Sequence, residues 1–292
     1  MNAPWNPLTS TWSLATISLG TTLLLSPVGI GGGGCNNHHG GTIEVHVESP
    51  CCGDPSYARE DDLLLRRIVW DDGSEFDDFI LASDVREVEY SGPNNRVRVI
   101  TGHQCETGDP GVYPINIEDG DGAGTSGQDR QLFADRILNA FNHLNLNAYV
   151  HRRTCSDFSC VIEFEDTIRD NSPLSDEIGE LLVMEVSGNS WIRLEAVDAQ
   201  GNSLGTPYVI ERYRRISPER LFTRRYSNSG SPLCSYYEWK ATGVDLSDLG
   251  VNELRSIRVS TPSNAGGSDI KASFRIAGIR TSTIPTAAMV FD

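Results

Sequence analysis

Residues 181–204 have the sequence LLVMEVSGNSWIRLEAVDAQGNSL and contain two segments that favour β-strands. The tripeptide SGN at residues 187–189 separates the two segments, and the sequence DAQGN at residues 198–202 closes the second. In residues 191–197 every other side chain is apolar, so these side chains would face one side of a sheet. This stretch predicts two strands separated by a tight turn.

The same alternation returns later in the chain, at residues 254–259 (LRSIRV) and 273–279 (SFRIAGI). Nearer the N-terminus it is found at residues 42–47, 84–90 and 96–100. Short strands separated by turns rich in Gly, Asn, Asp and Pro are typical of a sandwich or jelly roll. The sequence therefore predicts a mainly β fold, an antiparallel β-sandwich or jelly roll with one amphipathic helix and a smaller N-terminal β region.

The helix is predicted from Ser126 to about residue 145, because apolar residues recur there at helical spacing. Such a stripe packs against a sheet far more often than it binds a cofactor. The apolar residues are Phe133, Ile137, Phe141 and Leu144, joined by Leu132 and Leu138. The chain then divides into an uncharged tail (residues 1–42), a small β domain (43–117), an acidic Gly linker with the helix (118–150), a β-sandwich domain (151–285) and a C-terminal tail (286–292).

Residues 164–205 resemble a module of bacterial exported surface proteins, which often carry a sorting tail of the PEP-CTERM type. The resemblance is carried by the sequence DNSP at residues 170–173, by Glu185 and by GNS at residues 188–190. It continues through residues 243–251, 258–262 and 276–279, and covers about the last 130 residues. It implies an exported β-sandwich without catalytic residues. The chain ends in TAAMVFD and not in a sorting tail, which argues against anchoring by that route.

The charge of the chain excludes one class of partner. Forty acidic residues stand against 24 basic ones, giving a formal net charge of −16. Proteins that bind nucleic acid non-specifically need Lys and Arg to neutralise phosphates, so no nucleic-acid partner is predicted. Lys240 and Lys271 are the only lysines, and Arg suits protein interfaces better than Lys does. A bias in residue usage explains the excess of arginine equally well.

The N-terminal tail contains no charged side chain before Glu44. Its apolar stretch at residues 12–30 has the length of a secretory signal but no basic residue before it. Pro27 and the missing flanking charges disfavour a membrane span. The β-branched and Leu-rich run at residues 14–19, which contains Leu14, Ile17 and Leu19, suits strand addition to the sheet edge of another subunit. We therefore expect a retained assembly arm; a non-standard signal peptide is the alternative.

Seven cysteines leave at least one thiol free or paired between chains in an oxidising compartment. Cys155 and Cys160 flank the sequence SDFS, and this spacing predicts a local hairpin disulfide. His38, His39 and His46 lie near Cys35 without zinc-finger spacing, so a Gly/Asn/His-rich flexible stretch is favoured over a metal site.

No cofactor is predicted apart from a structural calcium ion, for which five aspartates are candidates. Asp119 and Asp121 stand at positions one and three of an EF-hand-like loop, but Ala123 and Arg130 break the rest of its ligand set. A solvated Gly/Asp linker is therefore the favoured interpretation there. The other three candidates follow or precede predicted strands, where a turn or helix-cap role is favoured: Asp245, Asp248 and Asp269.

Residues 211–225, ERYRRISPERLFTRR, depart from the acidic background. Such an arginine-aromatic segment could dock onto the acidic face of a neighbouring copy or bind an anionic glycan. In the alternative interpretation the charges of a solvated loop pair internally. The segment has two glutamates and six arginines: Arg212, Arg214, Arg215, Arg220, Arg224 and Arg225.

Motifs of catalysis are missing from the sequence, which has no Gly-x-Ser-x-Gly, no phosphate loop and no Gly-x-Gly-x-x-Gly after a strand. We therefore predict a protein that is not an enzyme. It is expected to be a structural subunit of an extracellular, cell-surface or virion-type assembly, with other copies or subunits as partners. The alternatives are a secreted glycan-binding sandwich, with a face bearing Trp191, Tyr208 or Trp239, and, ranked last, a hydrolase of unrecognised type.

Overall fold

The computed structural model describes ten stretches of the chain, namely residues 42–48, 63–91, 97–101, 115–116, 127–152, 157–171, 179–217, 221–226, 232–261 and 272–281. The chain divides into two compact units, residues 1–39 and 40–292, and every described residue belongs to the second. The predicted assembly-arm residues Leu14, Ile17 and Leu19 therefore lie outside the described residues.

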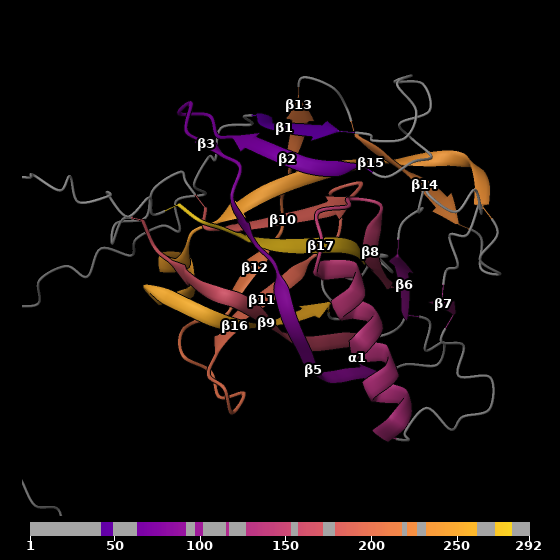
Figure 1. The fold of residues 1–292 in the computed structure, drawn as a ribbon, viewed down its shortest axis with the longest axis vertical. Coiled ribbons are helices and arrows are strands. Elements are labelled where there is room, and N and C mark those ends of the chain that lie inside the picture. The colour runs from indigo at the N-terminus through magenta and orange to yellow at the C-terminus, as the bar shows by residue number, and fades with distance from the viewer. Residues whose placement is uncertain are drawn as a thin grey trace, which may run out of the picture. The chain divides into compact units, whose positions relative to one another are not determined.

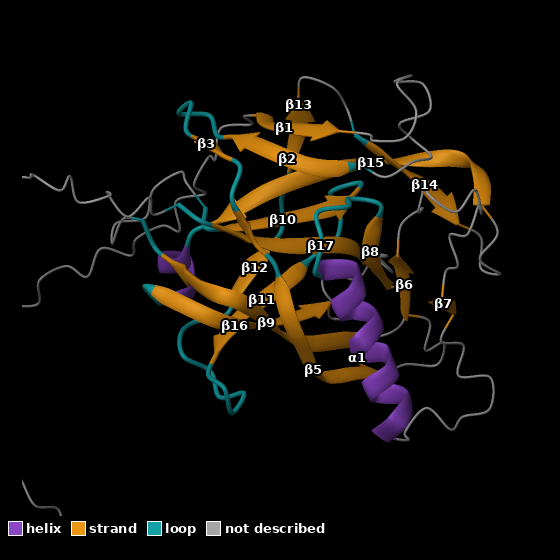
Figure 2. Ribbon diagram, in the orientation of Figure 1, coloured by secondary structure: helices purple, strands orange, loops and turns teal. Residues whose placement is uncertain are grey.

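Two sheets and one α-helix make up the described part, which confirms the predicted mainly β fold (Figures 1 and 2). The five-stranded sheet has the order β12 (Tyr208–Ile210), β11 (Ile192–Val197), β16 (Glu253–Thr261), β9 (Asp157–Arg169) and β5 (Ala82–Ser91). The order of the twelve-stranded sheet is β3 (Glu75–Phe76), β2 (Leu64–Val69), β1 (Thr42–Glu48), β13 (Arg214–Ser217), β15 (Pro232–Val244), β10 (Leu181–Val186), β17 (Ala272–Ile279), β8 (Ala148–Arg152), β6 (Val97–Thr101) and β7 (Ile115–Asn116). In addition β14 (Phe222–Tyr226) pairs with β15, and β4 (Phe79–Ile80) pairs with β17. Neighbouring strands are antiparallel except β1 and β13, which run parallel.

The main hydrophobic core lies between the two sheets. Val183 and Phe274 of the large sheet join Ile162, Leu194 and Val259 of the small sheet in one buried cluster. This packing of two inner faces is the defining feature of a sandwich. The alternating apolar residues of β11 and β16 form the inner face of the small sheet, as their sequence predicted.

A second buried cluster lies on the opposite face of the large sheet. Leu182 and Met184 of β10 and Trp239 of β15 contribute to it, together with Ile43 of β1 and Ile68 of β2. All five side chains are at most 2 % exposed, so both faces of the large sheet are buried around β10. Because β10 supplies side chains to both clusters, all six of its residues are buried, which explains the continuous apolar run at its start.

Helix α1 (Gly127–Phe141) is formed where the apolar stripe predicted it. Phe133, Ile137 and Phe141 are fully buried in the main core, and α1 packs against β5, β6 and β8. Leu132, by contrast, is 48 % exposed and lies outside the stripe. Within the described residues no helix has the length and apolar character required to cross a membrane.

The N-terminal strands do not form a separate domain, in contrast to the division predicted at residue 117. β1 pairs with β13, β5 with β9, and β6 with β8, so the strands from residues 43–117 belong to the same two sheets as the later strands. Alternation within each strand predicted its existence but could not reveal its partner, because backbone pairing between distant segments leaves no mark in either sequence.

Cys160 is a free, fully buried thiol, so the structure does not contain the predicted disulfide with Cys155, which lies outside the described residues. The reason is the alternation of β9, which directs Cys160 into the main core between Phe158 and Ile162. Burial also raises the pKa of the thiol to about 12, which suppresses the thiolate needed for disulfide exchange. Cys160 therefore acts as a small core side chain.

The turn at residues 187–189 carries the chain from β10 in the large sheet to β11 in the small sheet. Ser187 (φ 75°) and Gly188 (φ 63°) both adopt the left-handed conformation. The buried Glu185 holds this turn: its carboxylate accepts hydrogen bonds from the Asn189 N–H (3.1 Å) and the Ser190 hydroxyl (2.8 Å). Burial is the main cause that raises the pKa of Glu185 to about 7.

Candidate metal site at one end of the sandwich

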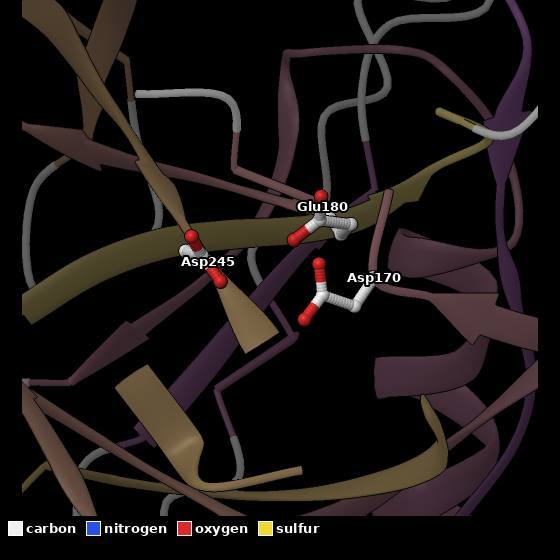
Figure 3. A group of neighbouring side chains, drawn as sticks. All are labelled: Asp170, Glu180 and Asp245. Carbon is white, nitrogen blue, oxygen red and sulfur yellow. The ribbon is translucent and has the colours of Figure 1, made fainter. Parts of the chain in front are cut away.

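Three carboxylates from both sheets meet at one end of the sandwich (Figure 3). Asp170 directly follows β9 of the small sheet, whereas Glu180 directly precedes β10 and Asp245 directly follows β15, both in the large sheet. One oxygen of each carboxylate lies within 4.8 Å of the others. Glu180 is fully buried, Asp245 is 5 % exposed and Asp170 is half-buried.

Two glycines allow these carboxylates to approach. A Cβ atom on Gly179 would lie 2.4 Å from the Val244 backbone nitrogen and 2.6 Å from the Gly243 Cα. The backbone of Gly179 therefore touches the backbone of residues 243–244, and no side chain would fit at position 179.

We expect Gly179→Ala to lower the free energy of unfolding by about 2 kcal/mol or more, because the clash is with backbone atoms that cannot rotate away. Chemical denaturation monitored by tryptophan fluorescence would measure the change. Gly73→Ala is the matched control: a Cβ atom added to Gly73 would meet no atom within 4 Å, but its φ is 86°, so only about 1 kcal/mol is expected. Equal losses in the two variants would contradict the close approach.

Glu180 is held by backbone hydrogen-bond donors. Its Oε2 accepts a hydrogen bond from the Leu246 N–H (3.1 Å), and its Oε1 accepts one from the Asn171 N–H (3.4 Å). Burial, reinforced by the charge of Asp245, raises the pKa of Glu180 to about 7, although the two hydrogen bonds oppose that rise. Near neutral pH this carboxylate is therefore poised between its protonated and ionised forms.

Asp245 has the cap role that its position in the sequence favoured. It precedes the 3₁₀-helix η2 (Leu246–Leu249), and its Oδ1 accepts a hydrogen bond from the Ser247 N–H at 2.7 Å. Gly250, with a φ of 71°, ends the same helix. Asp245 therefore has two roles: its Oδ1 caps η2, and its carboxylate belongs to the cluster with Asp170 and Glu180.

Carboxylate oxygens are the ligands that calcium prefers, so this cluster has the donor chemistry of a calcium site. Of the two predicted calcium candidates that the structure describes, Asp245 belongs to the cluster, whereas Asp248 is exposed and lies outside it. Asp119, Asp121 and Asp269 lie outside the described residues. The sequence could have indicated Asp170 and Glu180, because both directly adjoin strands, but nothing in it shows that these strand ends meet.

The arginine-rich segment is divided by the structure. Arg214 is paired with Asp71 (Nη1–Oδ2 2.7 Å), as the internal-pairing interpretation predicted for it. Arg212 and Arg215 are exposed, and neither makes an ion pair or side-chain hydrogen bond with another described residue. Arg220 and the side chains of Arg224 and Arg225 lie outside the described part of the chain.

One of the three aromatic residues considered for a glycan-binding face is unsuited to that role. Trp239 is fully buried in the second cluster, where its ring meets Tyr149 edge-to-face with centroids 5.3 Å apart. Trp191 and Tyr208 are half-buried, and Tyr208 packs against the main core. The prediction for Trp239 was wrong because a tryptophan in an alternating strand carries no signal for which of two buried faces it occupies.

A close serine–histidine contact joins Ser273 and His151, whose Oγ and Nδ1 atoms are 2.6 Å apart. These residues are direct cross-strand partners on β17 and β8, and Ser273 is only 5 % exposed. The Ser273 N–H also donates a hydrogen bond to the Glu185 carboxylate (3.3 Å), so the contact belongs to the hydrogen-bonded interior of the sheet.

No family model matches the chain, and no curated protein or solved structure matches it. Function is therefore inferred from the charges on the described surface and from the buried polar groups.

Proposed function

We propose that this chain is a non-enzymatic structural subunit of an extracellular or virion-type assembly, such as a surface filament, layer or phage particle. Copies would contact one another through the N-terminal tail and the arginine-rich segment. The observation that carries the proposal is the exposure of Arg212 and Arg215 without acidic partners among the described residues of a chain whose net charge is −16. Unpaired cations on an acidic protein attract the acidic surface of another copy.

The buried polar groups support a structural role. Arg275, which is 2 % exposed, donates from Nη1 to the backbone carbonyls of Ala140, Asn145 and Ala148 at 2.6–2.8 Å. Glu185 likewise accepts hydrogen bonds from the turn that joins the sheets. Both ionisable groups hold backbone segments in place and are shielded from solvent, whereas a catalytic group must reach its substrate.

The oligomeric state of the purified full chain tests the proposal. We expect sedimentation velocity and negative-stain electron microscopy to show particles larger than one chain, and these particles to dissociate as NaCl is raised from about 50 to about 500 mM. Salt screens charge contacts on exposed surfaces, so a contact between arginines and acids weakens with ionic strength. A monomer at every concentration and salt level would refute the proposal.

A secreted glycan-binding module is the second candidate. In this candidate the exposed arginines Arg212 and Arg215 would bind an anionic glycan, whereas Trp239 would not contribute because it is buried. Binding of monomeric protein to an array of sulfated and carboxylated glycans, without self-association, would favour this candidate.

A further inference from the structure

Two cations stand directly opposite each other on neighbouring strands of the large sheet. Arg215 of β13 is the register partner of Lys240 of β15. Like charges at such positions repel, because the side chains of direct cross-strand partners lie about 5 Å apart at Cβ. Arg215 is exposed and Lys240 half-buried, and we refer to the two residues as the cation pair.

Neither member of the cation pair is neutralised within the described part of the chain. Neither Arg215 nor Lys240 makes an ion pair or side-chain hydrogen bond there. The other neighbour of Lys240 is Glu185, whose carboxylate is turned to Asn189, Ser190 and the backbone N–H of residue 273 instead. A repulsive pair without a partner is a feature that binding of an acidic group would relieve.

An acid-rich turn lies beside the cation pair on the same sheet. Residues 71–78 have the sequence DDGSEFDD, and we refer to them as the acid turn. Thr42 of β1 is the register partner of Arg215, and Glu44 of β1 is the register partner of Val69 of β2. Because β1 and β2 are antiparallel, continuing this register by two residues places Asp71, the first residue of the acid turn, level with Arg215. Only β1 separates Asp71 from Arg215, which corresponds to roughly 10 Å at the usual spacing of strands, whereas β1 and β2 lie between Arg215 and Glu75 of β3.

Three acids of the acid turn form ion pairs with arginines of the same chain, whereas another acid has no such partner in the part of the chain that the structure describes. Asp71 pairs with Arg214, Glu75 with Arg67 (2.7 Å), and Asp78 with Arg280 (2.9 Å). Asp77 is exposed and has no partner among the described residues. The acid turn therefore presents negative charge beside a positive pair that it does not neutralise in its own molecule.

We infer that the cation pair of one copy binds the acid turn of a second copy, in a twofold arrangement. Because the two patches lie side by side, a twofold axis between them would place the acid turn of each copy on the cation pair of the other. Such an interface makes the same contact twice and is self-complementary. This inference rests on the proposed self-association and names the surfaces that carry it.

A charge-swap experiment on the full chain tests the inference. Variant one carries Arg215→Glu and Lys240→Glu, and variant two carries Glu75→Lys and Asp77→Lys. Each variant alone should have a dissociation constant for self-association at least about tenfold above that of the wild type, because both contacts become repulsive. An equimolar mixture should associate again, because each contact then joins opposite charges.

Arg193→Glu is the matched control, since Arg193 is an exposed arginine of the small sheet without an ion pair among the described residues. It should leave self-association unchanged. Circular dichroism and thermal melting show whether each variant is folded, and Arg215→Glu alone replaces variant one if the double change prevents folding.

Three outcomes would overturn the inference. If the wild type self-associates but variants one and two do so equally well, the proposed function survives and these surfaces are not the contact. If folded variants lose association but their mixture does not regain it, the two patches do not bind each other. If the wild type is a monomer and the cation pair is needed only for binding to sulfated polysaccharide, the partner is a glycan and the proposed self-association fails as well.

Discussion

Replacement of Arg275 by methionine is expected to lower the free energy of unfolding by about 3 kcal/mol, corresponding to a melting temperature about 6–12 °C lower. Arg275 satisfies the carbonyls of Ala140, Asn145 and Ala148, which lie at and after the C-terminal end of α1. Methionine fills a similar volume but removes the guanidinium donor from all three carbonyls, of which the Asn145 carbonyl keeps a hydrogen bond from the Ala148 N–H (3.1 Å). It also removes the cost of burying the guanidinium, whose pKa burial lowers to about 9, so the net loss is smaller than the sum of three lost hydrogen bonds.

Thermal denaturation and hydrogen exchange of residues 140–148 measure this effect. Arg130→Met is the matched control, because Arg130 is an exposed arginine of α1, the helix whose C-terminal end Arg275 contacts from β17, and it should change stability by less than about 0.5 kcal/mol. If Arg275→Met does not fold, Arg275→Lys keeps the charge with a different donor geometry and should still accelerate exchange in residues 140–148. Unchanged stability and exchange in the Arg275 variants would show that α1 is held by its apolar face alone.

Between pH 5 and pH 8 the stability of Glu180→Gln relative to the wild type is expected to rise by about 2.5 kcal/mol when divalent cations are removed with EDTA. The folded state raises the pKa of Glu180 from 4.5 to about 7. A raised pKa favours the folded state while the carboxyl is protonated there, so this contribution is present below pH 4.5 and is lost as the pH rises to about 7. Glutamine is uncharged at every pH, but its amide nitrogen cannot accept the hydrogen bond that one of the two Glu180 oxygens accepts. The change in the difference between variant and wild type across this window, and not its absolute value, therefore reports the raised pKa of Glu180.

Urea denaturation at several pH values measures that difference. Other groups also change with pH: Glu185 has a similarly raised pKa, and burial lowers the pKa of His143 to about 4. Both occur in wild type and variant and therefore cancel in the difference. A constant difference between pH 5 and pH 8 would contradict the raised pKa of Glu180.

Calcium should reduce the loss of stability in the wild type above pH 7, because a cation bound among the three carboxylates would offset the repulsion between their negative charges once Glu180 is ionised. A ligand at 100 times its dissociation constant stabilises by about 2.7 kcal/mol, which unfolding experiments detect easily. Asp248→Asn should respond to calcium as the wild type does, because Asp248 lies outside the cluster, whereas Glu180→Gln should respond much less. An equal response in all three proteins would place any calcium effect elsewhere.

The sequence predicted the helix and seven of the seventeen described strands, because each of these elements carries its own local signal, but it missed the two longest strands, β9 and β15. The stripe through Phe133, Ile137 and Phe141 predicted α1, and alternation predicted β11 and β16. The helix-cap role favoured for Asp245 is also found, because a cap depends only on the residues that follow it. Local chemistry was sufficient wherever the partner of a side chain lies within a few residues.

Pairing between distant segments was decided only by the tertiary structure. The sequence determined a mainly β chain with one amphipathic helix and a strongly acidic, arginine-rich composition. It could not show that Asp170 and Glu180 meet Asp245, that Arg215 stands opposite Lys240, or that Cys160 points into the core. Each of these contacts depends on strand register and on which face a strand buries, and a shift by one residue would reverse every side chain without changing the local pattern.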